Sequence, residues 1–413
     1  MRRIHPEPPF VAGMTNVSSF VEANEILRDA AFGAGGFEEE SLPFRGGTLL
    51  ESDGEAHARR RRLESQLFTN RMLDRYEEGV LDRAIERCLK EADSGRGPDG
   101  VVRADLVRLS RRMFLQIAAA VIGLDAVDTP ERTDLLERCM YALNAAFDVK
   151  FSTRDHAEVV AEGLAAKADF VAHFYRQSAE RRAGFLARHR DGSVAEADLP
   201  SDLLTAMMRH HDDSWDADLP VREAILYLAG ATETTSNAIT HALVDLQRWL
   251  VDHPEDRAHL GAAAFLRGVC NEALRLHSNV TALARRATGD ITLSSGRVFP
   301  SGERIAVNIV EANRDPDAFG ADAARFNPWR EVPEGVRPYG LVFGAGRHVC
   351  IGLPLTTTVS GKPAAEGRSD RAMLKVVRAL IDAGVELDPE REPRYVPTAE
   401  EVYASLPVVL RTR

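Results

Sequence analysis

Cysteines are scarce in this sequence, and the four that it has lie far apart along 413 residues. So sparse a set excludes a disulfide-stapled scaffold, and no CxxC or Cys/His cluster indicates a zinc site.

Long apolar runs are also lacking. The longest, MFLQIAAAVIGL at 113–124, contains a glutamine, whereas a membrane span needs about 20 apolar residues. No apolar core follows the arginines of MRRIHPEPPF, as a signal peptide would require. We therefore expect a cytoplasmic protein without a membrane anchor.

An excess of positive charge is lacking as well, because 52 basic and 63 acidic residues give a net charge of −11. A general nucleic-acid binder needs a basic face to displace counterions, so we expect no nucleic acid as a partner, with HARRRR at 57–62 as the one stretch that departs from the acidic balance. No Pro/Gly/Ser-rich linker is long enough to divide the chain. We therefore expect a single domain over residues 1–413 with a sizeable core, and a monomer.

Helical periodicity dominates the chain to about residue 280. It predicts helices at about 21–32, 54–68, 71–93, 103–124, 130–148, 154–185, 201–211, 220–252 and 262–277. Alternation and Ser-Gly pairs over 291–310 predict hairpin strands. Residues 311–345 look irregular, and a late helix is expected at about 370–383. The predicted fold class is mainly α with a small β region.

The stretch FGAGRHVCIG surrounds Cys350 with glycines. A lone cysteine is usually a small buried hydrophobe, but Gly344 and Gly346 permit a close approach of the backbone to a ligand. Phe343 offers a flat face, and His348 points to the same side as the thiol in an extended chain. The glycine spacing does not match a dinucleotide fingerprint. These residues predict a loop that wraps under a flat ligand and presents one thiolate.

A second motif, GATETT, lies in the middle of the predicted 220–252 helix. Helical threonines usually bond to the backbone one turn back, so the cluster alone has an ordinary explanation. Glu233 beside Thr234, next to the small Gly230 and Ala231, nevertheless suggests a pocket with a path for protons. Threonine back-bonding also offers a mechanism for a local distortion of the helix.

Two further patterns involve arginine. Glu272 and Arg275 lie three residues apart on one helix face, where such a pair is usually a surface ion pair of little worth. In HARRRR, four consecutive arginines spread over about 300° of a helix and make no single stripe. His57 and Arg61 do share a face. A solvated basic face or a nucleic-acid patch is the alternative for this stretch.

Taken together, these motifs resemble the cytochrome P450 superfamily, in particular its soluble bacterial-type haem-thiolate monooxygenases. The signature F-G-x-G-x-H-x-C-x-G matches in full, and the motifs follow the family's order from about residue 17 to 410. The resemblance implies a cytochrome P450 fold with haem b between a long distal helix and a proximal cysteine loop, and Cys350 as the axial thiolate on iron. It implies haem contacts for His57, Arg61, Ala231, Arg285, Phe343, Gly344, Gly346, His348, Cys350 and Gly352.

The resemblance also implies other roles. Thr234 would donate a hydrogen bond toward oxygen, and Glu233 would help to relay protons. Glu272, Arg275 and Arg330 of FNPWR would brace the cysteine loop, which is a structural role. The remaining arginines of HARRRR, with Arg347, would form a basic proximal face for an acidic electron donor. Substrate contacts, or equally core positions, are expected at Phe37, Leu42, Phe44, Ala229, Gly230, Thr281 and Leu283.

The implied function is a monooxygenase of secondary metabolism that inserts one atom of O2 into a small apolar or aromatic molecule. Its electrons would come from a separate ferredoxin-type donor and its reductase. The alternatives are a peroxide-driven peroxygenase and a non-catalytic haem-thiolate protein for docking or sensing. The intact Glu233–Thr234 pair argues against both.

Two features depart from the family's pattern. The segment before VEANEILRD is shorter than usual, and the family usually continues from the cysteine into a long helix. Here LPLTTTV is followed by SGKPAAEGRSD, in which Gly361 and Pro363 are poor helix formers. We expect a loop insertion over 359–370, with the helix resuming near Asp370 as a candidate N-cap.

Overall fold

The computed structural model describes residues 11–35, 39–358, 371–396 and 402–411. The chain consists of two compact units, each with its own core. Unit 1 comprises Met1–Gly36, Ile85–Ser110 and Thr234–Arg413, and unit 2 comprises Phe37–Ala84 and Arg111–Glu233. Helices α5 (Asp82–Asp93), α6 (Leu106–Ile122) and α11 (Leu219–Asp252) contribute residues to both. The predicted class, mainly α with a small β region, is confirmed.

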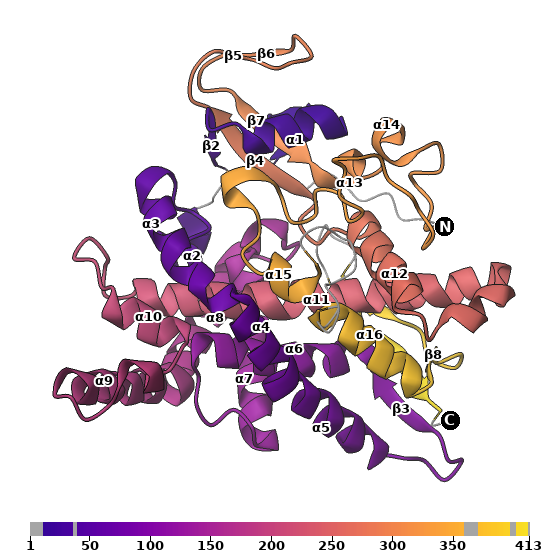
Figure 1. Cartoon of the computed structure of the whole chain (residues 1–413), viewed down its shortest axis with the longest axis horizontal. Helices are drawn as coiled ribbons and strands as arrows, with labels where there is room; N and C mark the ends of the chain where they lie inside the picture. The colour runs from indigo at the N-terminus through magenta and orange to yellow at the C-terminus, as the bar shows by residue number, and fades with distance from the viewer. Residues whose placement is uncertain (1–10, 36–38, 359–370, 397–401, 412–413) are drawn as a thin grey trace. The chain divides into compact units, whose positions relative to one another are not determined.

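A four-stranded sheet of unit 1 has the strand order β1-β7-β4-β2. Its strands are β1 (Thr15–Val17), β2 (Phe32–Ala34), β4 (Ala282–Ala287) and β7 (Arg304–Asn308). β4 runs antiparallel to β2 and β7, whereas β1 is parallel to β7. Helix α1 (Phe20–Arg28) lies beside the sheet (Figure 1) and buries its apolar face in the same core as the strands. This sheet positions three of the predicted site residues. Leu283 and Arg285 lie on β4, and Thr281 lies directly before it.

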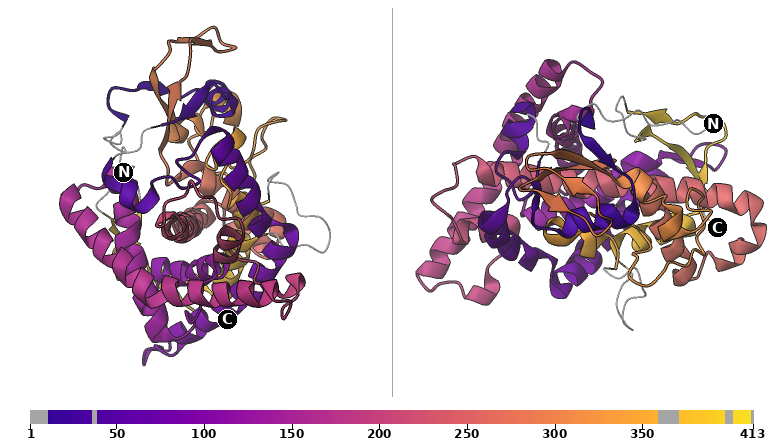
Figure 2. Two further views of the ribbon diagram at one scale, coloured as in Figure 1. Left: turned by 90° about the vertical axis from the view of Figure 1, so that its left-hand side faces the viewer. Right: turned by 90° about the horizontal axis from the view of Figure 1, so that it is seen from above.

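Smaller sheets complete the strands of the described ranges. β3 (Val102–Asp105), β11 (Pro407–Leu410) and β8 (Val385–Leu387) form one sheet, with β11 in the centre. β9 (Arg394–Tyr395) pairs with β10 (Tyr403–Ser405). β5 (Ile291–Thr292) and β6 (Val298–Phe299) form a hairpin that projects beyond β4 and β7 (Figures 1 and 2).

The helices of unit 1 include α12 (Ala263–Leu276), which packs against α16 (Ala372–Asp382). Short helices α13 (Ile309–Ala312), α14 (Pro316–Phe319) and α15 (Leu353–Thr356) interrupt the irregular region between β7 and α16. The late helix predicted at about 370–383 is therefore confirmed as α16. The expected insertion at 359–370, with the candidate cap Asp370, lies outside the described residues.

Unit 2 is built from helices. They are α2 (Leu42–Arg45), α3 (Gly54–Glu64), α4 (Asn70–Tyr76), α7 (Pro130–Phe147), α8 (His156–Phe170), α9 (Arg176–Arg190) and α10 (Leu203–Arg209). Side chains of Thr129, Asp155 and Asp202 cap the first turns of α7, α8 and α10 by accepting backbone hydrogen bonds, as N-cap residues of these types usually do. None of the helices in the described ranges combines the length and the apolar character that crossing a membrane requires.

Two predictions of local structure are wrong. Residues 103–105 were expected to begin a helix, but they belong to β3 because they pair with β11, some 300 residues later in the chain. No strand was predicted before residue 291, but β4 begins at Ala282. The hairpin predicted over 291–310 is confirmed for β5 and β6, whereas β7 pairs with β4 and β1 instead.

Candidate functional site

The cysteine loop, residues 343–352, folds back on itself and presents its thiol. The backbone N–H of Cys350 donates to the Phe343 carbonyl at 2.8 Å. Gly346 has a φ of 68°, and a Cβ there would lie 2.5 Å from the Leu27 carbonyl oxygen, so only glycine lets the loop pack this closely on the end of α1. Cys350 is exposed, whereas the other three cysteines are buried. The predicted loop with one accessible thiol is thus present.

One turn of helix, α15, follows the thiol. Gly352 is its N-cap and accepts backbone hydrogen bonds from Leu355 and Thr356 at 3.0 and 3.1 Å. The backbone of Thr357 is already extended, so the helix ends where the β-branched threonines begin. The helix thus stops early, as expected, and it does so within LPLTTTV, at Thr356. A helix this short adds little dipole behind Cys350.

Strand β4 brings two predicted residues to the cysteine loop. A Cβ added to Gly344 would lie 3.7 Å from Leu283 Cδ1, so the Leu283 side chain reaches that loop. Arg285 lies two residues further along the strand and therefore on the same face, and its side chain is buried. Thr281, directly before β4, is buried and accepts the Ile309 N–H at 2.9 Å. Unit 1 therefore gathers Leu283 and Arg285 on the face of β4 beside Gly344.

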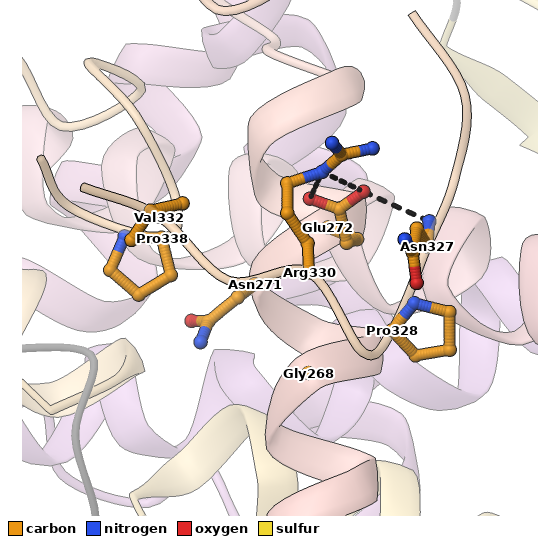
Figure 3. A pocket seen from close by; sticks show the side chains of 8 residues that line it. All are labelled: Gly268, Asn271, Glu272, Asn327, Pro328, Arg330, Val332 and Pro338. Carbon is orange, nitrogen blue, oxygen red and sulfur yellow. Dashed lines mark hydrogen bonds and ion pairs between the residues drawn. The ribbon is translucent and has the colours of Figure 1, made fainter. Parts of the chain in front are cut away.

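The three residues that were assigned a bracing role do form one network. The Glu272 carboxylate accepts from Arg275 Nε at 2.7 Å and Nη2 at 2.8 Å. It also accepts from Arg330 Nε at 3.2 Å through both oxygens and from the Asn327 N–H at 3.0 Å (Figure 3). Arg275 is completely buried and donates to the carbonyl oxygens of Asn313, Ala323 and Arg325 as well. The network therefore ties α12 to the irregular segment that precedes the cysteine loop.

The FNPWR segment lies directly on α12. A Cβ on Gly268 would be 1.9 Å from the Pro328 carbonyl oxygen, so this contact requires glycine. A small pocket of about 30 Å³ adjoins the network and is lined by Gly268, Asn271, Glu272, Asn327, Pro328, Arg330, Val332 and Pro338 (Figure 3). That volume suits a water molecule and is far too small for an organic substrate.

Helix α11 carries the GATETT motif without a break in its α-helical geometry. Thr232 is buried and bonds back to the Leu228 carbonyl at 2.7 Å, as helical threonines commonly do. Gly230 and Thr234, one turn apart, are exposed, and a Cβ on Gly230 would meet nothing within 4 Å. Thr234, in the middle of α11, thus lies on an exposed part of that helix.

Glu233 has a partner that the sequence did not reveal. It forms a close ion pair with Arg111 of α6, which also donates to Tyr141 Oη at 2.8 Å and lies over the Tyr141 ring at 4.7 Å. Burial alone would lower the pKa of Arg111. The attraction of Glu233 and Tyr141 for its positive charge outweighs burial, so the pKa of Arg111 lies above its usual value. The candidate proton carrier is thus held by a buried arginine, which nothing in the sequence RRM distinguishes from its neighbour Arg112.

The candidate haem helix α3 places His57 on its buried face and Arg61, one turn later, in a half-buried position. Arg59 and Arg62 are exposed, as a basic face requires. Arg60 is buried and ion-paired to Glu223 at 3.1 Å, so its inclusion in an exposed basic face is wrong. Consecutive residues on a helix differ by about 100° in direction, which is why one of the four arginines points inward.

The expected substrate residues lie in different environments. Phe37 is outside the described residues. Leu42 is partly exposed on α2, whereas Phe44 is fully buried against Gly163 of α8, which favours its core alternative. Ala229 is buried on α11.

The residues present fit the cofactor that the sequence implies. Within the described ranges, no three His, Cys, Asp or Glu side chains gather as a metal site. Haem needs only one protein ligand on its proximal side, because the porphyrin supplies the other donors. Within unit 1, the exposed Cys350 and the buried cation of Arg285 are parts that such a group needs.

Comparison with known proteins gives consistent results. The family model "Cytochrome P450" matches residues 255–359. Cytochrome P450 monooxygenase PikC of Streptomyces venezuelae is 28% identical over 317 residues, which cover 74% of this chain and 64% of PikC. A methyl-branched lipid omega-hydroxylase of Mycobacterium tuberculosis is 27% identical over 314 residues, covering 75% of this chain and 65% of the relative. The chain thus spans just under two thirds of these relatives.

The crystal structure of CalO2 matches 97% of this chain and 92% of its own with a TM-score of 0.71 and 21% identity. The cytochrome P450 fold predicted from the sequence is therefore confirmed.

Proposed function

The chain belongs to the cytochrome P450 superfamily, and from this premise we propose that it is a haem-thiolate monooxygenase, an oxidoreductase. The observation that carries the proposal is Cys350, an exposed thiol on a loop whose sequence matches the family signature at every defined position. Structural cysteines are usually buried, as the other three are here, so exposure indicates a ligand or a reactive group.

We assign the haem contacts as follows. Cys350 would be the axial thiolate, and Phe343, Gly344, Gly346 and Gly352 would shape the loop beneath the porphyrin. His57, Arg61, Arg285 and His348 would donate to the propionates, and Ala231 would face the macrocycle. Charged hydrogen bonds of this kind are strong because donor and acceptor are both ionised. On this proposal, the two units together make up a single cytochrome P450 domain.

The reaction divides between the cofactor and the chain. Thiolate-ligated haem supplies the chemistry that cleaves O2. Thr234 would hold a hydrogen bond toward the oxygen substrate from the open face of α11. Glu233, the preceding residue, would move protons at its carboxylate, whose partner in this structure is Arg111. The acid–alcohol pair favours a monooxygenase over a peroxide-driven enzyme or a docking protein, which have no need for proton delivery.

We further propose a small apolar or aromatic substrate and a ferredoxin-type protein as the electron source. Ala229 and Leu283 would provide apolar contacts. The relative that is named as a hydroxylase of methyl-branched lipids supports an apolar substrate. The exposed Arg59 and Arg62 on α3 support a basic docking face for an acidic donor.

A spin-state titration tests this function. Purified holoenzyme is titrated with a library of apolar compounds, and binders are then assayed for oxygenated product with a ferredoxin and its reductase. Thr234→Ala should retain haem but divert electrons to peroxide. Unchanged coupling of electron use to product in Thr234→Ala would refute the proton-delivery role.

A further inference from the structure

Helix α3 is docked by charged residues. Its sequence, GEAHARRRRLE, offers almost no apolar stripe, and its most buried side chains are His57, Arg60 and Glu64. These residues lie at positions i, i+3 and i+7, so they form one face of the helix. Helices usually dock through an apolar stripe that tolerates small rotations. A charged stripe must instead meet specific partners, because an unpaired buried charge is costly.

The partners lie one turn apart on α11. Arg60 Nη1 donates to Glu223 Oε2 at 3.1 Å, and Tyr227 Oη donates to Glu64 Oε2 at 2.8 Å. Arg60 and Glu64 are four residues apart on α3, and Glu223 and Tyr227 are four apart on α11. Two contacts at matching spacing fix both the rotation and the register of α3.

The loop before α3 completes the Arg60–Glu223 contact. Both Glu223 oxygens accept the Leu49 N–H, at 3.1 and 3.2 Å, and Arg60 Nη1 donates to the Gly47 carbonyl at 2.6 Å. The Arg60 guanidinium also lies over the Trp215 ring at 4.9 Å. Arg60 and Glu223 are thus satisfied on several sides and cannot exchange partners without moving this loop.

The two carboxylates of the cluster are not equivalent. Glu64 and Glu223 are both 0% exposed, and the buried Arg60 guanidinium is ion-paired with Glu223. The Glu223 carboxylate accepts from that guanidinium and from the Leu49 N–H, whereas among the described residues Glu64 Oε2 accepts only from the Tyr227 hydroxyl. Glu64 Oε1 has no hydrogen-bond partner within the described residues. A buried acid in that position keeps its proton.

The surrounding charges agree with this assignment. Burial and the charge of Glu223 raise the pKa of Glu64 well above its usual value, and the Tyr227 hydroxyl, Arg60 and Arg61 oppose that rise only in part. Burial also raises the pKa of Glu223, opposed first by Arg60. Arg222 on α11 acts on Glu223 in the same sense as Arg60.

We propose that Arg60, Glu64, Glu223 and Tyr227 form a buried lock that sets the position of α3, with Glu64 taking part in its protonated form. The same helix carries His57 and Arg61, so the lock aligns the cations that would meet the haem propionates. These four are positioning residues. Their role toward haem rests on the proposed function, whereas the lock itself does not.

Three variants of the full-length protein test the lock. Glu223→Gln leaves the Arg60 guanidinium buried without a carboxylate. Glu64→Gln replaces a protonated acid by a neutral group of the same shape that still accepts from Tyr227. Arg62→Gln, on the exposed side of α3, is the matched control.

Three quantities are measured for each variant: the rate of haem transfer to an excess of apomyoglobin, the haem reduction potential, and the melting temperature of the haem-free protein from pH 5 to 8. We expect Glu223→Gln to lose haem about tenfold faster than wild type or more, the equivalent of about 1.4 kcal/mol. We also expect it to shift the potential, which depends on the cations beside the propionates. Glu64→Gln and Arg62→Gln should stay within about twofold of wild type in the rate of haem loss at neutral pH.

The pH series tests the protonation state of Glu64. Because the folded pKa of Glu64 is raised, its contribution to stability is complete below the unfolded value near 4.5 and is lost as the pH rises toward the folded pKa. Glutamine does not titrate. The melting temperature of Glu64→Gln should therefore rise relative to that of wild type between pH 5 and 8, while Arg62→Gln should keep a constant offset.

The proposal is overturned if Glu223→Gln loses haem no faster than Arg62→Gln with an unshifted potential, or if Glu64→Gln is as damaging as Glu223→Gln. A lowered melting temperature of Glu223→Gln with unchanged haem loss and potential would overturn the alignment of His57 and Arg61 by the lock. If wild type takes up no haem, the proposed function fails. The lock then requires that haem-free Glu223→Gln melts at a lower temperature than haem-free Arg62→Gln, and equal melting temperatures of the two variants overturn it.

Discussion

Glu272→Gln removes a buried negative charge of unit 1 that forms ion pairs with two arginines. The Glu272 carboxylate is almost fully buried and is shared by the guanidinium groups of Arg275 and Arg330. Glutamine has nearly the same shape, but it removes the negative charge and turns an amide N–H2 toward a cation. The buried Arg275 then loses its carboxylate partner, whereas Arg330 keeps its second carboxylate, that of Asp322.

The expected loss follows from this geometry. Removing one partner of a buried ion pair costs about 3–5 kcal/mol of unfolding free energy. Arg275 keeps its carbonyl acceptors at 2.7, 2.6 and 3.2 Å, which lessens the cost. Arg330 keeps Asp322 at 2.7 Å. We therefore expect a loss near the lower end, about 3 kcal/mol.

Urea unfolding of the haem-free protein, followed by far-UV circular dichroism, measures this loss. Asp322→Asn is the matched control, because Asp322 binds the same Arg330 from a half-exposed side chain (47%) and should contribute less than about 1 kcal/mol. A loss below about 1 kcal/mol for Glu272→Gln, or an equal loss for Asp322→Asn, would refute the assignment of Glu272 as the centre of the network.

Two further predictions concern the cysteine loop and the candidate proton carrier. Gly346→Ala should lower the free energy of unfolding in urea more than Gly302→Ala. Both glycines have a positive φ, but only a methyl group at position 346 would clash with backbone atoms. Equal losses of unfolding free energy would contradict the tight packing of the loop on α1. Arg111→Gln should change the solvent deuterium isotope effect on turnover while the haem spectrum stays that of wild type, because it removes the ion-pair partner of Glu233. An unchanged isotope effect would show that Glu233 carries no protons during turnover.

Local patterns in the sequence were sufficient to predict the helices and the thiol. Apolar periodicity predicted α11, α12 and α16, and the glycines around Cys350 predicted a loop that exposes it. The same local logic failed for β3 and β4, because their strand character depends on partners far away in the chain. A strand that is only a few residues long has too little periodicity of its own to outweigh helical neighbours.

Buried charges were the least predictable part of the site. Four consecutive arginines in HARRRR look alike in sequence, yet only Arg60 faces inward, because its partner Glu223 lies 163 residues away. Arg111 is likewise indistinguishable from Arg112 until α6 and α11 fold against each other. Such pairs are set by tertiary geometry and leave no periodic signal in the sequence.

The central claim is that Cys350 binds haem iron as a thiolate, and the carbon monoxide difference spectrum of the reduced protein tests it most directly. The claim predicts that the wild type shows the red-shifted Soret band that thiolate ligation produces, and that Cys350→Ala loses this band. The far-UV circular dichroism of Cys350→Ala should equal that of the wild type, because the Cys350 side chain is exposed and contributes little to the core. An unshifted Soret band in the wild type, or a red-shifted band that persists in Cys350→Ala, would contradict it.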